Sequence, residues 1–148
     1  MEPKQRDYYQ KLRRRIRMWF ERKAERSPTW AEYILFAPDL FHLLCKLMTD
    51  DDVPAKDKAK VAVAIAYFIS PFELVPEGVV GPIGYIDDIA LAAYVLDGII
   101  NNAGADVLRR HWAGEDDVLE VVQLILRRAT SILGRLWSKL VKVVDRIT

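Results

Sequence analysis

Four carboxylates gather around one short stretch, residues 67–88, that is otherwise mostly apolar. Glu73 and Glu77 are four residues apart, so a helix would place them on one face, and Asp87 and Asp88 follow after the next glycines. Carboxylate oxygens are the ligands that Mg²⁺, Mn²⁺ and Ca²⁺ prefer in proteins. The same acids could instead accept hydrogen bonds from free N–H groups at helix ends and turns. We favour this structural role, because no nucleophile or base stands beside them, and keep a divalent-cation site as the alternative.

A second, weaker pair of metal-ligand types is His42 and Cys45, which lie three residues apart and so share a helix face. No matching second pair follows, and a single free cysteine is usually a buried apolar residue, so packing is the better interpretation. The sequence also lacks a phosphate-binding glycine loop and a Ser–His–Asp set. We therefore predict no catalytic residue and no cofactor, and incline against an enzyme.

The elements that position the four carboxylates follow from the composition of residues 67–88. Three prolines and three glycines there exclude a plain helix, and the scarcity of Ser, Asn and Lys argues against a surface loop. Apolar residues at helical spacing precede this stretch in 61–69 and follow it in 86–100. The sequence thus predicts a buried turn that joins two apolar helices.

The same stretch resembles the YkvA-like family (domain of unknown function 1232). Its hallmark, roughly Ser-Pro-x-Asp-Leu-Ile-Pro-Asp, an apolar link and Gly-Tyr-Leu-Asp-Asp, is matched by Ser-Pro at 70–71, Glu-Leu-Val-Pro-Glu at 73–77 and Gly-Tyr-Ile-Asp-Asp at 84–88. Two departures are Glu73 in place of Asp and a link one residue longer. The longer side chain of Glu73 would loosen a tight metal geometry. The resemblance extends over about residues 55–126. It implies little about function, since members are mostly uncharacterised and often described as membrane-associated.

Helical periodicity continues through the rest of the chain, and no segment alternates with period two over the length of a strand. The fold class predicted is all-α: one compact domain, residues 1–148, of about six helices around the central helix–Pro/Gly turn–helix hairpin. The predicted parts are a basic amphipathic N-terminal helix (1–26), the YkvA-like core (55–126) and a long amphipathic helix (117–147) that Gly134 kinks. Three aspartates at 50–52 are expected to cap the helix that follows them.

The N-terminal helix combines arginines with an aromatic stripe. Arg13, Arg14, Arg15 and Arg17 surround apolar positions that include Trp19 and Phe20. The simplest interpretation is a solvated helix that packs its stripe on the core. The alternative is a helix that lies on an anionic membrane with Trp19 and Phe20 inserted. Specific nucleic-acid binding is the weakest interpretation, because no base-reading motif accompanies the arginines.

Net charge is +1 over the chain, but it is distributed unevenly: +6 over residues 1–26, −10 over 27–126 and +5 over 127–148. The single cysteine excludes an intramolecular disulfide, and the charged N-terminus lacks the apolar segment of a secretory signal, so a cytoplasmic location is expected. The longest charge-free run around the hairpin, 61–72, has twelve residues, short of the ~20 that a membrane-spanning helix needs.

The function predicted from the sequence is a small non-catalytic interaction module at the cytoplasmic membrane surface, peripheral to the inner membrane. Its partner would be anionic lipid or another protein. A metal-dependent hydrolase built on Glu73, Glu77, Asp87 and Asp88 is the second interpretation, and a nucleic-acid-binding module is the third. The sequence does not determine a substrate or an oligomeric state.

Overall fold

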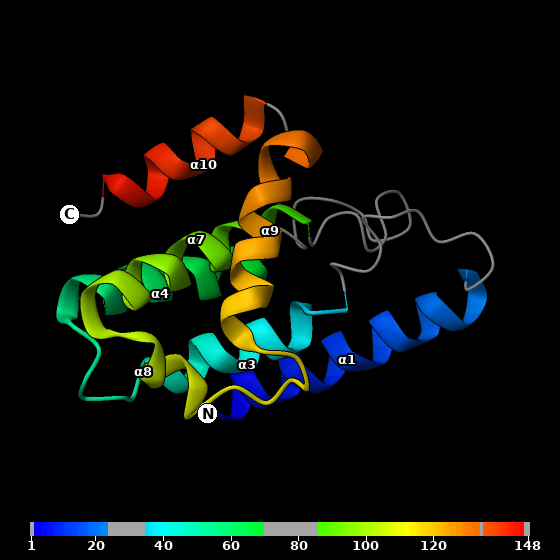
Figure 1. The fold of residues 1–148 in the computed structure, drawn as a ribbon. Helices are drawn as coiled ribbons and strands as arrows, with labels where there is room; N and C mark the ends of the chain where they lie inside the picture. Colours follow the sequence, from blue (N-terminus) through cyan, green and yellow to red (C-terminus); the bar gives the residue numbers. More distant parts are fainter. Residues whose placement is uncertain (1, 24–34, 70–85, 134, 147–148) are drawn as a thin grey trace.

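The computed structural model describes residues 2–23, 35–69, 86–133 and 135–146. Within these ranges every regular element is a helix, which confirms the all-α prediction (Figure 1). The helices are α1 (Pro3–Lys23), α3 (Ala37–Leu47), α4 (Ala55–Ile69), α7 (Ile86–Ala103), α8 (Ala105–Arg109), α9 (Val118–Leu133) and α10 (Arg135–Asp145).

Helix α7 lies at the centre, and α3, α4, α8, α9 and α10 all contact it. Its buried side chains point to several sides of the helix rather than to one stripe, so each side needs a covering neighbour. Small residues among them allow these neighbours to approach closely. The buried apolar residues of α7 are Ile89, Ala90, Leu91, Ala92, Ala93, Val95, Leu96 and Ile99.

The two helices of the predicted hairpin, α4 and α7, pack side by side. Helix α4 is less enclosed than its composition suggests. Although 61–69 is apolar nearly all round, Ala62 and Ala66 are exposed, because alanine is compatible with either environment. The Pro/Gly segment that connects the helices lies outside the described residues.

A buried carboxylate links the start of α4 to the end of α7. Asp57, in the first turn of α4, is only 1% exposed, and both of its oxygens accept from Nδ2 of Asn102 at 3.2 Å. Asn102 belongs to the last turn of α7, which ends just before Gly104. Gly104 has φ = 95°, a left-handed conformation that glycine adopts without steric cost and that commonly terminates helices.

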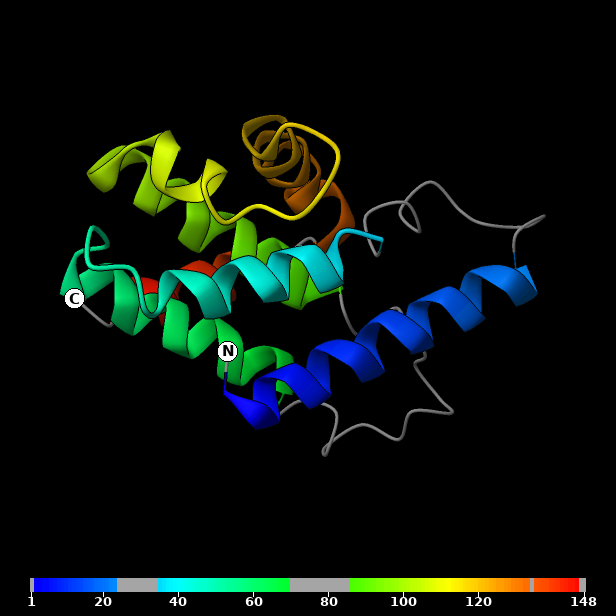
Figure 2. The same cartoon turned by 90° about the horizontal axis from the view of Figure 1, so that it is seen from below.

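Helix α1 packs across α3 through a group of aromatic rings. Tyr8 meets Phe41 edge to face, with centroids 4.8 Å apart, and Phe41 meets Phe68 of α4 in the same way at 5.6 Å. The Tyr8 hydroxyl also donates to the Phe68 carbonyl oxygen at 2.7 Å. The far end of α1 extends past the other described helices in both views (Figures 1 and 2).

The C-terminal part differs from the single kinked helix predicted over 117–147. Helix α9 ends at Leu133, and α10 begins at Arg135 and crosses back over α7 (Figure 1). Tyr94 of α7 holds α10: its hydroxyl donates to Asp145 at 2.8 Å, and its ring meets Trp137 edge to face. Burial, together with Asp145, raises the pKa of Tyr94 to about 12, so this hydroxyl keeps its proton. Helices α1 and α10 lie on opposite sides of the described helices (Figure 1).

We expect Asn102→Ala to lower the free energy of unfolding by about 1–3 kcal/mol, because it leaves the buried Asp57 carboxylate without these two hydrogen bonds. Urea unfolding followed by circular dichroism measures the change. Asn101→Ala is the matched control: Asn101 is exposed in the same turn, and its loss should change stability by less than about 0.5 kcal/mol. Equal effects of the two substitutions would refute the role given to the Asp57–Asn102 pair.

Candidate functional site

Of the four carboxylates predicted around the Pro/Gly turn, the structure describes the side chain of Asp88. Asp88 is 1% exposed in the first turns of α7, where carboxylates are favoured by the helix dipole. Asp87 has its backbone in α7, but its side chain is outside the described part, and so are Glu73 and Glu77. The burial of Asp88 agrees with both helix capping and metal binding and does not distinguish them, so both interpretations remain predictions.

Among the residues that the structure describes, no three His, Cys, Asp or Glu side chains are close enough to hold a metal ion. His42 and Cys45 do share a face of α3, as their spacing predicts. Cys45 is 2% exposed, and burial raises the pKa of its thiol to about 12, so it is not ionised near neutral pH. The His42 ring packs against Tyr9, with centroids 5.4 Å apart, and burial lowers the His42 pKa. These two residues therefore behave as packing residues.

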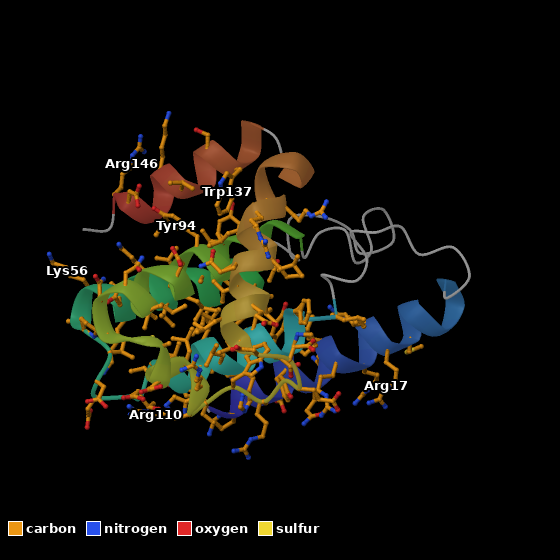
Figure 3. All side chains as sticks on the ribbon, viewed as in Figure 1. Arg17, Lys56, Tyr94, Arg110, Trp137 and Arg146 are labelled. Atoms are coloured by element: carbon orange, nitrogen blue, oxygen red, sulfur yellow. The ribbon has the colours of Figure 1, made fainter. Side chains whose placement is uncertain are left out.

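The exposed side of α1 carries a dense group of Lys and Arg side chains, the cationic face of this helix. The apolar side chains of Leu12 and Ile16 are buried at 0% and 3% exposure against the core. The cations of this helix between Lys4 and Arg17 are exposed, and the labelled Arg17 points away from the other helices (Figure 3). This face consists of Lys4, Arg6, Lys11, Arg13, Arg14, Arg15 and Arg17.

Not all of these cations are equally available. The Arg13 guanidinium lies over the Tyr9 ring, 5.6 Å from its centroid, and its charge also acts on Asp39 of α3. Arg14 and Arg17 are exposed, and none of the described acids forms an ion pair with them. The backbone of Trp19 and Phe20 belongs to α1, whereas their side chains lie outside the described part, so their predicted role as a membrane anchor is untested.

A polar cluster that the sequence does not predict joins the α3–α4 turn to the end of α8. Oδ2 of Asp50 lies 2.7 Å from Nε2 of His111 and 3.3 Å from Nη1 of Arg110, while its Oδ1 accepts from the Asp52 backbone N–H at 2.8 Å. Arg110 also donates to the Asp52 carboxylate at 2.8 Å. Because an ionised carboxylate only accepts, Nε2 is the protonated nitrogen of His111 in this pair.

The environment of Asp50 stabilises its charged form. The backbone N–H of Asp52, and then His111, lower the pKa of the Asp50 carboxyl below its ordinary value, although burial opposes them. The expectation that Asp50 caps the following helix is therefore wrong: its oxygens bind Asp52 within the turn and two residues of the α8 end. No local signal connects positions 50 and 111, because only the fold brings them together.

We expect Asp50→Asn to destabilise the protein at pH 7 by about 1–3 kcal/mol, because charge-assisted hydrogen bonds are lost from a buried group. The folded-state pKa is lowered, so this stabilisation is present above the unfolded pKa of about 3.9 and is lost as the pH falls through the folded value. Urea unfolding at pH 7 and at stepwise lower pH measures both effects.

Asp51→Asn is the control for that measurement, since Asp51 is the exposed neighbour in the same turn. Wild type and Asp50→Asn should converge in stability at low pH. A difference between them that stays constant with pH would show that the lost charge is not the cause.

Comparison with known proteins places the chain among relatives without an assigned role. It is 24% identical over 118 residues, 80% of this chain and 81% of the relative, to the "Uncharacterized protein ORF9" of Methanothermobacter thermautotrophicus. No solved structure matches the chain. Residues 57–94, from the buried Asp57 of α4 to Tyr94 of α7, match the model of the family described as "Protein of unknown function (DUF1232)", which confirms over this segment the resemblance inferred from its motif.

Proposed function

We propose that the protein is a small interaction module that binds the anionic surface of the cytoplasmic membrane through the cationic face of α1. The observation that carries this proposal is the division of α1 into two faces. Leu12 and Ile16 are used in the core, while Arg14 and Arg17 remain exposed on a helix whose far end extends past the other described helices (Figure 1). A helix that only packs on a core does not need this density of charge.

The balance of charge on α1 supports an anionic partner. Seven cations are exposed along the helix between Lys4 and Arg17, and one acid, Asp7, lies in the same range. Near an anionic leaflet each Lys or Arg contributes roughly 1 kcal/mol of attraction, which acts within a Debye length of about 8 Å at physiological salt. Several such charges on one rigid helix therefore provide useful binding without deep insertion.

The burial of Leu12 and Ile16 supports an electrostatic mode of binding. An interfacial helix usually inserts its apolar stripe among the acyl chains, but here that stripe already packs against the core. Met18, 45% exposed on the same helix, is left to contact lipid. Binding should accordingly be mainly electrostatic, and Trp19 with Phe20 would add to it. A long, apolar span is not part of the proposal: none of the described helices is long and apolar enough to cross a bilayer.

We expect Arg14→Gln with Arg17→Gln to weaken binding to vesicles of mixed anionic and neutral lipid by about 2 kcal/mol, or roughly 30-fold in the partition coefficient. These two arginines are chosen because Arg13 also contacts Tyr9, so its loss would disturb packing. Co-sedimentation with vesicles at low and high salt measures the effect. Wild-type binding should require anionic lipid and should weaken as salt is added.

Arg127→Gln with Arg128→Gln is the matched control, because it removes the same charge from exposed positions on α9. It should bind nearly as well as wild type. Equal losses in both double variants would mean that net charge alone, and not the α1 face, causes binding. Tighter binding to duplex DNA than to vesicles would indicate that the cationic face of α1 binds nucleic acid. Vesicle binding that is unchanged in the Arg14/Arg17 variant would contradict the membrane assignment.

A further inference from the structure

A cavity of about 620 Å³ opens between the start of α3 and the loop that connects α8 to α9. None of its described lining residues belongs to the cationic face of α1, so the proposed membrane binding does not account for it. Some of the residues that line it are apolar or aromatic, and the others include three acids. The main lining residues are Leu35, Phe36, Asp39, Trp112, Glu115 and Asp116.

The loop side of the cavity is held in place around an indole ring. Nε1 of Trp112 donates to the Asp116 carbonyl oxygen at 2.7 Å, which closes the loop on itself. Gly114 lies directly against the ring, and a Cβ built there would be 2.5 Å from Cζ2 of Trp112. Only glycine fits beneath the indole in this arrangement, so Gly114 and the hydrogen bond to Asp116 together position the Trp112 ring.

The charge of the lining has one sign. Asp39, Glu115 and Asp116 contribute carboxylates, and the lining residues within the described part include no Lys, Arg or His. Glu115 and Asp116 are exposed at the loop, whereas Asp39 is half-buried. Burial raises the pKa of Asp39 despite the nearby charges of His42 and Arg13, so this carboxylate is incompletely stabilised in its ionised form. An added positive charge would stabilise it.

We propose that this cavity binds a small organic cation: an ammonium group carried on an apolar or aromatic body. The ammonium would lie among Asp39, Glu115 and Asp116, and the body would contact Trp112, Phe36 and the half-exposed Leu35. The volume suits a small molecule, because ligand pockets of about 300–1,000 Å³ accommodate such compounds. An anion of the same shape is excluded by the carboxylates.

The probe for this proposal is 2-phenylethylamine, titrated into the full-length protein while the Trp112 Nε1–H signal is followed by ¹H–¹⁵N NMR. A Trp112→Phe variant assigns that signal among the four tryptophans. The amine should shift the signal saturably, and 3-phenylpropionate, an anion of similar shape, should not. Equal shifts by both compounds, or no shift by the amine, would overturn the proposal.

Asp39→Asn should raise the dissociation constant of the amine roughly tenfold, the effect of one charge-assisted contact. Glu115→Gln, at an exposed position without a packing role, gives a second measurement should Asp39→Asn disturb the fold. Asp106→Asn removes an exposed acid of α8 outside the lining and should leave binding unchanged. Unchanged affinity in both lining variants would also overturn the proposal.

A basic segment of a second chain could supply the same chemistry in place of a small amine. Sedimentation velocity at rising protein concentration distinguishes the two sources. A monomer that persists at high concentration supports the small-molecule assignment. A dimer that 2-phenylethylamine dissociates would show that the occupant is a second copy of this chain, against the proposal.

Discussion

A helix that buries side chains on several sides must be enclosed by its neighbours, and α7 imposes this requirement on the molecule. Its buried residues face α3, α4, α8, α9 and α10, so these helices are arranged around one axis rather than in a layer. Hydrogen bonds between side chains link α7 to two of the helices around it. Asn102 binds Asp57 at one end of α7, and Tyr94 binds Asp145 where α10 crosses it. Apolar burial thus accounts for which helices pack on α7, and these hydrogen bonds fix α4 and α10 against it.

Helix α1 stands outside this enclosure and contacts the core mainly through α3. Its anchor is aromatic and apolar, through Tyr8, Leu12 and Ile16, and the seven cations between Lys4 and Arg17 are exposed. The desolvation cost of a charge explains the division, since an arginine is expensive to bury unless it is paired. The opposite side of the molecule ends in α10 with exposed Lys142 and Arg146 (Figure 3). Positive charge therefore lies at two opposed surfaces of the bundle.

The sequence predicted the helices better than the contacts between them. Local rules suffice where proline or glycine marks a helix end, as Pro38 does in the first turn of α3 and Gly104, with its positive φ, does just after α7. The pairing of Asp50 with His111 was not predicted, since it joins positions 61 residues apart. For the acid-rich turn at 50–52, local rules favoured a helix cap. The roles of the carboxylates of Glu73, Glu77 and Asp87 stay predictions, because their side chains are outside the described part of the structure.

The buried position of Cys45 has a practical consequence for studying this protein. It is the single thiol of the chain, it lies in the core contributed by α3, and its high pKa keeps it in the unreactive protonated form. A thiol reagent can therefore reach it only when α3 separates from its neighbours. The rate of labelling thus reports how often the core opens, with no engineered probe. A cysteine introduced at the surface would, conversely, react alone, so spectroscopic tags can be attached without removing the native residue.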